Sequence, residues 1–527
     1  MAKSIRLLDC TLRDGGHINQ GKFGENVIRN VTEKLVEAQI DIIEAGFLWS
    51  EYAGADIARY HTIEEAKRIL PKERGISKFS LMADFIDLNH LEENDGTVDY
   101  IRLSFKRHRL NWGLQTAKLL MEKGYQCFIN PVNCNVYSDE EYIGVLKRVN
   151  ELHPYGFSIV DTFGVMRLND LAHRYYLVEN NLSQDIVIGL HLHENLGLAY
   201  SLAQHFISIA SPKRDIIIDG SLMGMGREPG NLCIEQIMDY MVNQFGMNYH
   251  LEPVYDLIDD YIVSIKNKHQ WGYAIPYALS ARYNLHRTYA EYLMGKKRLG
   301  TKDIQRVLQQ IEPDEAELFN EDYVEKLYLN YMDVKYDDGH DMENISDSIC
   351  RFDKILVLAP GKSILHYKDE IAKYENDNSC IIAVNFVPEF MTPDYVFLTN
   401  LKRYDAIKFD LESELIITSN LMRDISDRSY VIEYTKLVYF DEIFCDDSTL
   451  MLFNLLSRLE WKREIAVAGF DGECTQGKLE FYDASYGSVE VPVEKALKIR
   501  GISKQFEESL GIKSVTPSSY IRERVEN

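Results

Sequence analysis

The sequence predicts an α/β protein: a (β/α)8 TIM barrel with a helical extension, followed by a Rossmann-like α/β domain. Three observations predict this fold class. Apolar runs of strand length alternate with helical patterns through residues 1–248, and polar residues directly follow several of these runs. A second strand–helix alternation begins after residue 350. Strands separated by helices indicate a parallel sheet, and eight such units in this length suit a closed barrel.

The eight strands expected in the barrel are short apolar runs. They are Ser4–Asp9, Asp41–Phe47, Phe79–Phe85, Tyr100–Phe105, Gln126–Val132, Phe157–Asp161, Ile186–His193 and Ile216–Asp219. The segments between them carry apolar residues at helical spacing. These expected helices are Glu25–Ala38, Ile57–Leu70, Leu88–Glu93, Leu110–Lys123, Asp139–Leu152, Asn169–Val178, Leu198–Ala210 and Leu232–Phe245. Ser138 and Glu141 predict a capping box at the start of one of these helices.

The chain beyond the barrel is expected to form three further segments. They are a helical extension at 249–332, a linker at 333–350 and the Rossmann-like domain at 351–527. Helices are expected in the extension at Leu257–Lys266, Tyr277–Leu293 and Lys302–Ile311. The linker is inferred from acidic residues without apolar periodicity.

The last domain shows a doubly wound pattern of strands and helices. Its expected strands are Lys354–Ala359, Cys380–Asn385, Tyr395–Thr399, Leu415–Thr418, Tyr430–Tyr434 and Ile465–Gly469, with helices at Ser363–Tyr374 and Ser448–Leu459. The loop Pro360–Ser363 follows the first strand. Gly361, Lys362 and Ser363 in this loop could seat a phosphate at a helix N-terminus, although the full P-loop and dinucleotide spacings are absent. The alternatives for this domain are nucleotide or nucleotide-sugar binding and a docking role without catalysis.

Composition narrows the classes of partner. The formal net charge of −24 argues against nucleic acid or an anionic membrane as the main partner. No apolar run reaches the roughly 18 residues of a membrane span, and the start lacks the pattern of a signal peptide. The 8 cysteines are scattered without a C-x-x-C pair, which indicates reduced thiols and a cytoplasmic protein.

The first strand ends in a group of charged residues. The sequence LDCTLRDGGH places Arg13, Asp14 and His17 within one loop after the apolar run. Charged groups beside a core must be paired or metal-bound, and glycines allow the tight turn between Asp14 and His17. A solvated loop with a surface ion pair is the plainer interpretation of this stretch alone.

A second motif strengthens the functional interpretation. His191 and His193 end the seventh strand as H-x-H, so both imidazoles point to the same face. Two such histidines could bind a divalent metal with a carboxylate from elsewhere in the fold, and Asp14 is the candidate. Structural hydrogen bonding of both histidines within the sheet is the alternative.

Further polar residues lie at the ends of other strands, where chemistry sits in such barrels. Asp9 ends the first strand, Glu44 lies near the end of the second, and Asn231 lies in a glycine-rich loop after the eighth. Each is expected either to ligate the metal or to support its ligands by hydrogen bonds.

The chain resembles the DRE-TIM metallolyases, the group that includes hydroxymethylglutaryl-CoA lyase and 4-hydroxy-2-oxovalerate aldolase. The resemblance rests on TLRDG at 11–15, GLHLHENLG at 189–197 and DGSLMGMGREPGN at 219–231, and covers roughly residues 1–300. His17, where acyl-CoA enzymes of the family usually carry glutamine or a similar residue, is the pattern of the aldolase branch.

The resemblance implies a carbon–carbon lyase that acts on small 2-oxoacid and aldehyde substrates. A divalent metal is expected on Asp14, His191 and His193; manganese is our first choice, and magnesium, cobalt or zinc would also suit these ligands. Arg13 would support the developing oxyanion, and His17 would act as the base for the C4 hydroxyl. In the aldolase branch, the helical extension contributes a tyrosine to the active site, and Tyr273 matches the position of that tyrosine.

The resemblance also implies partners and an alternative reaction. A homodimer through the barrel is expected, and the aldolase branch commonly pairs with an aldehyde dehydrogenase, which no residue here shows. The alternative function is a Claisen-type acyl transferase using acetyl-CoA and a 2-oxoacid. His17 and the lack of a recognisable acyl-CoA regulatory domain speak against it. A non-catalytic assembly protein is disfavoured by the intact set of candidate residues.

Overall fold

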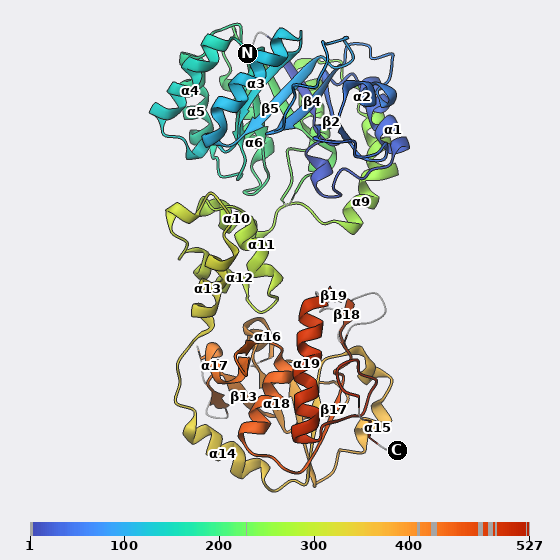
Figure 1. The fold of residues 1–527 in the computed structure, drawn as a ribbon, viewed down its shortest axis with the longest axis vertical. Helices are drawn as coiled ribbons and strands as arrows, with labels where there is room; N and C mark the ends of the chain where they lie inside the picture. Colours follow the sequence, from blue (N-terminus) through green and yellow to red (C-terminus); the bar gives the residue numbers. More distant parts are fainter. Residues whose placement is uncertain are drawn as a thin grey trace. The chain divides into compact units, whose positions relative to one another are not determined.

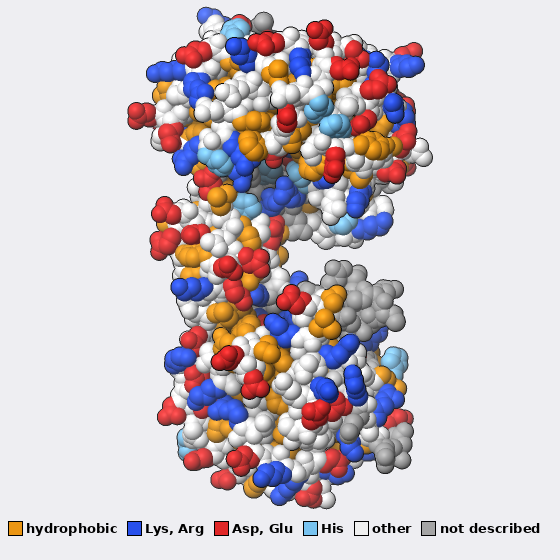
Figure 2. All heavy atoms as spheres, in the orientation of Figure 1, with side chains coloured by type: hydrophobic (Ala, Val, Ile, Leu, Met, Phe, Trp, Pro, Cys, Tyr) orange, Lys and Arg blue, Asp and Glu red, His pale blue; other side chains and the backbone are white. Residues whose placement is uncertain are grey.

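The computed structural model describes residues 4–227, 229–407, 412–422, 429–472, 478–482, 488–490, 493–522 and 524–525. The chain divides into two compact units, which we treat separately. The first unit contains Met1–Glu291 and Ile311–Phe319, and the second contains Tyr292–Gln310 and Asn320–Asn527. Acidic and basic side chains are interspersed over the face shown in Figure 2.

The first unit is built around a closed barrel of parallel strands. They are β1 (Ser4–Asp9), β2 (Ile42–Leu48), β4 (Lys78–Asp84), β5 (Tyr100–Phe105), β6 (Gln126–Pro131), β7 (Gly156–Asp161), β8 (Val187–Leu192) and β9 (Asp215–Gly220). Each strand pairs with its neighbours in this order, and β1 pairs with both β9 and β2, which closes the ring. The short strand β3 (Arg59–Tyr60) adds to β2 outside the ring. The predicted (β/α)8 barrel is confirmed.

Helices follow most of the strands and flank the barrel in Figure 1. They are α1 (Glu25–Glu37), α2 (Ile63–Ile69), α3 (Leu110–Glu122), α4 (Asp139–Leu152), α5 (Leu168–Asn181), α6 (Ala199–Ile209) and α7 (Ile234–Phe245). The capping box of Ser138 and Glu141 is present at α4.

Two of the predicted helices differ from the structure. Helix α2 begins at Ile63 rather than Ile57, because Arg59 and Tyr60 pair with β2 instead. The predicted helix Leu88–Glu93 is absent, and the chain there forms turns and irregular backbone. Asp87 accepts a hydrogen bond from the Asn89 N–H, a local bond that competes with helix formation.

Both faces of the barrel strands are buried. Residues such as Leu7 and Ile43 belong to the large apolar cluster that includes the helices. A separate smaller cluster includes Leu8, Phe128 and Ile217. This two-sided burial explains why the strands are continuous apolar runs rather than alternating ones.

The extension is helical, as predicted, but more broken. Its helices are α8 (Glu252–Leu257), α9 (Val263–Lys268), α10 (Ile275–Arg282), α11 (Thr288–Gly295), α12 (Thr301–Leu308) and α13 (Glu321–Met332), with a π turn at Ile258–Ile262. The single helix predicted at Tyr277–Leu293 is wrong, because Asn284 adopts a φ of 54° and ends α10 before α11 begins.

The second unit contains a seven-stranded parallel sheet, which confirms the predicted α/β domain. Its order is β14 (Ser429–Ile432), β13 (Glu414–Thr418), β12 (Tyr395–Leu398), β11 (Ser379–Val384), β10 (Lys354–Leu358), β17 (Glu464–Ala468) and β20 (Lys513–Ser514). Its helices are α14 (Gly339–Ile349), α15 (Lys368–Ala372), α16 (Leu401–Ile407), α17 (Thr435–Val438), α18 (Ser448–Arg458) and α19 (Val493–Leu510). Two short hairpins, β15 (Tyr439–Phe440) with β16 (Ile443–Phe444) and β18 (Lys478–Glu480) with β19 (Ser488–Glu490), complete the unit.

The segment predicted as a linker contains helix α14. Ile345 and Ile349 are one helical turn apart and are both buried, so the segment does have an apolar face. The acidic residues around them obscured this face in the sequence.

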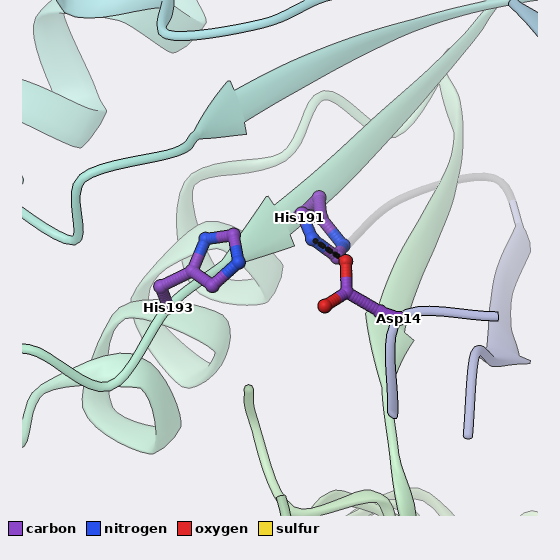
Figure 3. A group of neighbouring side chains, drawn as sticks. All are labelled: Asp14, His191 and His193. Atoms are coloured by element: carbon purple, nitrogen blue, oxygen red, sulfur yellow. Dashed lines mark ion pairs between the residues drawn. The ribbon is translucent and has the colours of Figure 1, made fainter. Parts of the chain in front are cut away.

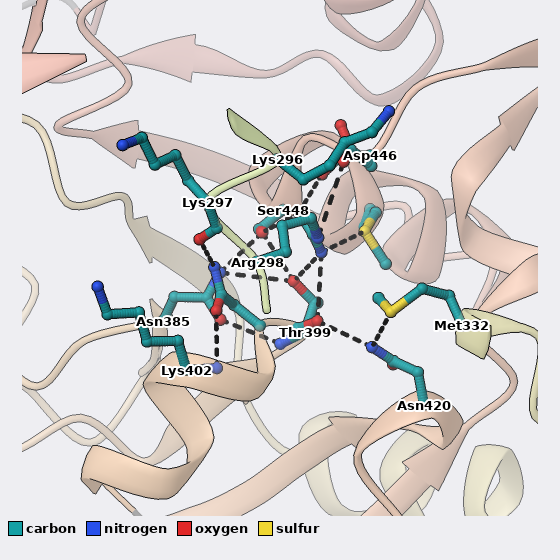
Figure 4. Close-up of polar contacts among 12 residues, drawn as sticks. Lys296, Lys297, Arg298, Met332, Asn385, Thr399, Lys402, Asn420, Asp446 and Ser448 are labelled. Atoms are coloured by element: carbon teal, nitrogen blue, oxygen red, sulfur yellow. Dashed lines mark hydrogen bonds and ion pairs between the residues drawn. The ribbon is translucent and has the colours of Figure 1, made fainter. Parts of the chain in front are cut away.

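Arg298 anchors the segment between α11 and α12 in the second unit. The side chain is only 6% exposed, and its Nη2 donates to the Thr399 carbonyl at 3.2 Å and to the Thr399 hydroxyl at 2.8 Å. Its Nη1 donates to the Asp446 carbonyl. Figure 4 shows this guanidinium among the polar residues that follow the strands, where Asn385 and Thr399 both bond to Ser448.

No helix among the described residues is long and apolar enough to cross a membrane.

Candidate metal centre

The candidate site lies at the carboxyl end of the barrel strands. Asp14 lies in the loop after β1, while His191 lies in β8 and His193 directly follows it. One possible ligand atom from each of the three lies within 4.8 Å of the other two. Figure 3 shows the three side chains gathered around one space. The structure thus brings together the three residues that the sequence predicts as metal ligands.

Hydrogen bonds orient both histidines. His191 Nδ1 lies 3.0 Å from the Asp219 carboxylate, and its Nε2 lies 3.4 Å from Asp14 Oδ2. His193 Nδ1 lies 2.9 Å from the Asp161 carbonyl oxygen. Each Nδ1 therefore has an acceptor within the protein, which leaves each Nε2 as the nitrogen for a ligand. Such outer contacts are what hold metal-binding histidines in one tautomer and orientation.

The charges at the site depend on one another. Burial disfavours the Asp14 carboxylate, but Arg13 and His191 outweigh it and hold the pKa of Asp14 well below its ordinary value. Burial also opposes a charge on His191, yet hydrogen bonds to Asp14 and Asp219 raise its pKa. Burial and the neighbouring His191 lower the pKa of His193 to about 4. Asp14 is therefore ionised and His193 neutral at neutral pH, the forms that bind metals.

A chain of buried ion pairs supports the site. Glu44 accepts from Arg13 Nε at 2.6 Å and from Arg102 Nη1 at 3.2 Å. Arg102 also donates to Asp219, which in turn holds His191. Glu44 thus supports Arg13 and is not in the metal group found among the described residues. The sequence analysis missed Arg102, although a single charged residue inside the buried run of β5 was a signal for it.

Asp9 and Asn231 play different parts. Asp9 accepts from the Thr11 N–H at 2.9 Å and from the Thr11 hydroxyl at 2.8 Å, so it shapes the loop that carries Arg13 and Asp14. Asn231 is 2% exposed and lies in a β-bridge with His193. Its Nδ2 donates to a backbone carbonyl at 2.9 Å, but its Oδ1 has no hydrogen-bond partner among the described residues. That buried oxygen is available as a further ligand.

His17 lies beside this group. Its ring packs against Phe47, with ring centroids 5.2 Å apart. Burial lowers the pKa of His17 to about 3; Asp14 opposes this shift, while Arg227 and Arg13 add to it. The imidazole is therefore neutral at neutral pH and has a lone pair to accept a proton.

The extension covers part of the same end of the barrel. Trp271 donates its indole N–H to the Met223 carbonyl at 2.8 Å, in the loop after β9. Tyr273 lies over Gly197, where an added Cβ would be 3.7 Å from the tyrosine ring. Tyr273 is 59% exposed. The structure thus places the predicted tyrosine at the barrel mouth but gives its hydroxyl no hydrogen bond among the described residues.

The candidate phosphate loop in the second unit is already occupied by a carboxylate. Asp471, after β17, accepts from the Ser363 N–H at 2.8 Å and also from its hydroxyl. A Cβ on Gly361 would lie 2.2 Å from the Gly469 carbonyl oxygen. Gly361 is therefore needed for the close approach of two loops, and a carboxylate beside Ser363 opposes a second anion. Lys362 begins the short 3-10 turn Lys362–Leu365.

The residues present fit a divalent metal. Two imidazole nitrogens, one ionised carboxylate and the orphaned Asn231 oxygen form a mixed nitrogen and oxygen donor set. Such a set suits manganese, magnesium, cobalt or zinc. None of these four candidate ligands is a cysteine thiolate.

Comparisons with known proteins find relatives that match about half of this chain or less. The HMGL-like family model matches residues 114–259. The 4-hydroxy-2-oxovalerate aldolase of Geobacillus genomosp. 3 is 24% identical over 272 residues, covering 50% of this chain and 77% of the relative. Oxaloacetate decarboxylase of Mycobacterium tuberculosis is 25% identical over 244 residues, covering 44% of this chain and 67% of the relative. A crystal structure of hydroxymethylglutaryl-CoA lyase from Pseudomonas aeruginosa aligns with a TM-score of 0.40 at 15% identity, covering 49% of this chain and 92% of that structure.

The family-model match and the similarity to 4-hydroxy-2-oxovalerate aldolases support a lyase. The part of the chain that carries the barrel is similar to the HMGL-like family, the DRE-TIM metallolyases.

Proposed function

We propose that the barrel is a divalent-metal-dependent aldolase that cleaves or forms 4-hydroxy-2-oxoacids through the enolate of pyruvate. The observation that carries this proposal is the convergence of Asp14, His191 and His193 beside Arg13 and His17. Two relatives named for cleaving 4-hydroxy-2-oxovalerate and decarboxylating oxaloacetate support it. Both reactions break a bond to the third carbon of pyruvate, so both need a stabilised enolate.

Asp14, His191 and His193, with Asn231 Oδ1 as a further oxygen, would hold the metal. When bound, a divalent metal supplies Lewis acidity that stabilises the negative charge developing on the enolate oxygen. Asp219 and Asp161 hold the two imidazoles in position for this task. Manganese is our first choice among the metals that such donors bind.

Arg13 stabilises the developing negative charge from the protein side. Its Nε donates to Glu44 and its Nη1 to Asp14, so two of its three nitrogens are fixed. Nη2 has no hydrogen-bond partner among the described residues, and it is the nitrogen left for a substrate oxygen. A guanidinium held rigidly in a buried site stabilises charge without reorganisation.

His17 takes the proton from the C4 hydroxyl during cleavage and returns it during condensation. The ring is neutral at neutral pH because burial lowers its pKa to about 3. Contact with Phe47 limits its motion, which keeps the accepting nitrogen near the substrate.

The proposal is tested by measuring pyruvate release from 4-hydroxy-2-oxoacids of increasing chain length, using the full chain after metal removal and after reloading with manganese. We expect release from at least one substrate only in the reloaded protein. Equal rates in stripped and reloaded protein, or no release from any of them, would contradict the proposal.

A further inference from the structure

Arg102 carries a charge inside the barrel rather than at its mouth. It is the third residue of β5, and its side chain is only 2% exposed. Burying a guanidinium is costly unless it is paired and hydrogen-bonded. The partners of Arg102 therefore indicate its role.

The guanidinium of Arg102 crosses the lumen of the barrel and joins two carboxylates. Its Nη1 donates to Glu44 of β2 at 3.2 Å, and its Nη2 donates to Asp219 of β9. Strand β9 lies four strands from β5 in either direction around the ring, so these two strands face each other across the barrel. With the Asn130 amide oriented to satisfy its own hydrogen bonds, Asn130 accepts from Arg102 Nε at 3.1 Å. All three nitrogens of Arg102 are thus held.

Each of the two carboxylates leads to one part of the candidate metal centre. Glu44 accepts from Arg13 Nε at 2.6 Å, and Arg13 is the residue assigned to the developing oxyanion. Asp219 lies 3.0 Å from Nδ1 of the candidate ligand His191. Arg13 and His191 also meet at Asp14, which His191 Nε2 approaches to 3.4 Å. Six buried side chains therefore form a closed ring of contacts: Arg13, Glu44, Arg102, Asp219, His191 and Asp14.

Arg102 acts on this centre only from behind. Its ion pairs among the described residues are with Glu44 and Asp219, and neither belongs to the group of candidate ligands. Contacts behind a metal-binding histidine fix its orientation, and their loss weakens metal binding. The planar fork of an arginine can hold two carboxylates at a fixed separation, whereas the ammonium of a lysine is a single point charge.

We propose that Arg102 is a positioning residue that fixes Arg13 and His191 relative to each other, and thereby sets both the affinity for the metal and the placement of the guanidinium beside it. The kinetic part of this inference rests on the proposed function, whereas the metal-binding part does not require the aldolase reaction.

Arg214 provides a matched control for the loss of a buried guanidinium. Its side chain is 0% exposed, its Nε donates to Glu179 at 2.8 Å, and its Nη1 donates to the Ile186 carbonyl at 2.8 Å. Arg214 directly precedes β9, so it lies at the end of the barrel opposite to the metal centre. Arg214→Gln should therefore destabilise the fold without changing the metal centre.

The first test is calorimetric titration of the metal-stripped full chain with manganese. We expect Arg102→Gln and Arg102→Lys to weaken manganese binding by about 10- to 100-fold, the usual effect of losing a contact behind a metal ligand. Arg214→Gln should bind manganese as the wild type does, although denaturant unfolding should show that it is less stable. Arg102→Lys keeps a cation in the lumen, so it decides the outcome if Arg102→Gln does not fold.

The second test examines the metal centre when it is fully loaded. The visible absorption of bound cobalt(II) depends on the number and arrangement of its ligands. At saturating cobalt, the spectrum of Arg102→Lys should differ from that of the wild type, and the spectrum of Arg214→Gln should not. At saturating manganese, exchange of the pyruvate methyl protons should fall by about tenfold or more in Arg102→Lys, because Arg13 loses its fixed position.

The outcomes separate this inference from the proposed reaction. Manganese affinities and cobalt spectra of the Arg102 variants equal to those of the wild type would overturn the positioning role and leave the aldolase proposal standing. Weaker binding in the Arg102 variants alone, in a protein that exchanges no pyruvate protons, would support the positioning role and overturn only the proposed reaction. Equal weakening in Arg214→Gln would indicate a general loosening of the barrel and would overturn the positioning role.

Discussion

Asp14 is the residue whose loss should most reduce metal binding at the candidate site. It faces His191 at 3.4 Å and is held ionised by Arg13, so it couples the metal ligands to the buried ion pairs. We expect Asp14→Asn and His191→Ala to lose most bound metal and nearly all turnover while the fold is retained. Metal analysis after dialysis against manganese, together with circular dichroism, measures both effects.

A matched pair on the surface provides the control for this prediction. Asp139 and His173 form an exposed carboxylate–imidazole pair at 2.9 Å. Asp139→Asn and His173→Ala should keep the metal and the activity. Full metal occupancy in Asp14→Asn would show that the ligand assignment is wrong.

His17 should separate two activities of the same centre. His17→Ala should lower aldol cleavage by about two to four orders of magnitude, the usual range for a general base. Exchange of the pyruvate methyl protons should fall much less, because it needs no proton transfer from the C4 hydroxyl. Proton NMR in deuterated buffer follows the exchange, and a coupled assay follows cleavage. Cleavage near the wild-type rate would mean that another group is the base.

His286 should make the protein less stable in mild acid. Its pKa in the folded protein is about 4, below the ordinary value of 6.5, so the unfolded chain takes up the proton first. The stability present above pH 6.5 is therefore lost as the pH falls toward 4. In metal-free protein, denaturant unfolding of His286→Gln should show a shallower loss over this range than wild type. The exposed His108→Gln is the control, and identical pH profiles for wild type and His286→Gln would refute the prediction.

At the scale of elements, the strands were predictable and the breaks between helices were not. The barrel strands are buried on both faces, so each appears in the sequence as an uninterrupted apolar run, and β1 and β5 match their predicted bounds. Asn284 ends α10 through a left-handed backbone, which apolar spacing does not reveal. Helix α14 was not predicted because its buried side chains are just two isoleucines, Ile345 and Ile349. Two apolar residues are too few to show a helical period in the sequence.

The candidate site was predictable for the same reason. Its candidate ligands follow or interrupt apolar runs with histidine or carboxylate, a costly pattern that stands out in a sequence. Arg102 was missed because it lies mid-strand and because its role depends on Glu44 and Asp219 from other strands.

Arg298 should contribute strongly to the stability of the second unit, because it holds the segment before α12 against the residues that follow the strands. Arg298→Ala would leave Thr399 and Asp446 without their buried partner, and removing one member of such a group costs about 3–5 kcal/mol. Lys297→Ala, at the exposed neighbouring position, is the control and should cost far less. Denaturant unfolding measures both variants, and equal stabilities would contradict the anchoring role.

At the scale of the whole molecule, the two units do not follow the predicted segments. Residues 292–310 and 320–332 were predicted in the extension but belong to the second compact unit. A homodimer through the barrel and an aldehyde dehydrogenase on the extension stay predictions, as does nucleotide binding or docking by the second unit. Gly361 permits a close approach of two backbone segments. Its substitution by a larger residue should therefore destabilise the second unit, whether or not the loop binds a ligand.

Metal-dependent exchange of the pyruvate methyl protons tests the central claim most directly, since it needs only the metal centre and no aldehyde. The full chain is stripped of metal, reloaded separately with manganese, magnesium, cobalt and zinc, and followed by proton NMR in deuterated buffer. We predict exchange in at least one reloaded protein, no exchange in the stripped protein, and loss of exchange in Asp14→Asn under the same loading. Absence of exchange with all four metals, or equal exchange in Asp14→Asn, would contradict the assignment of this barrel as an enolate-forming metal centre.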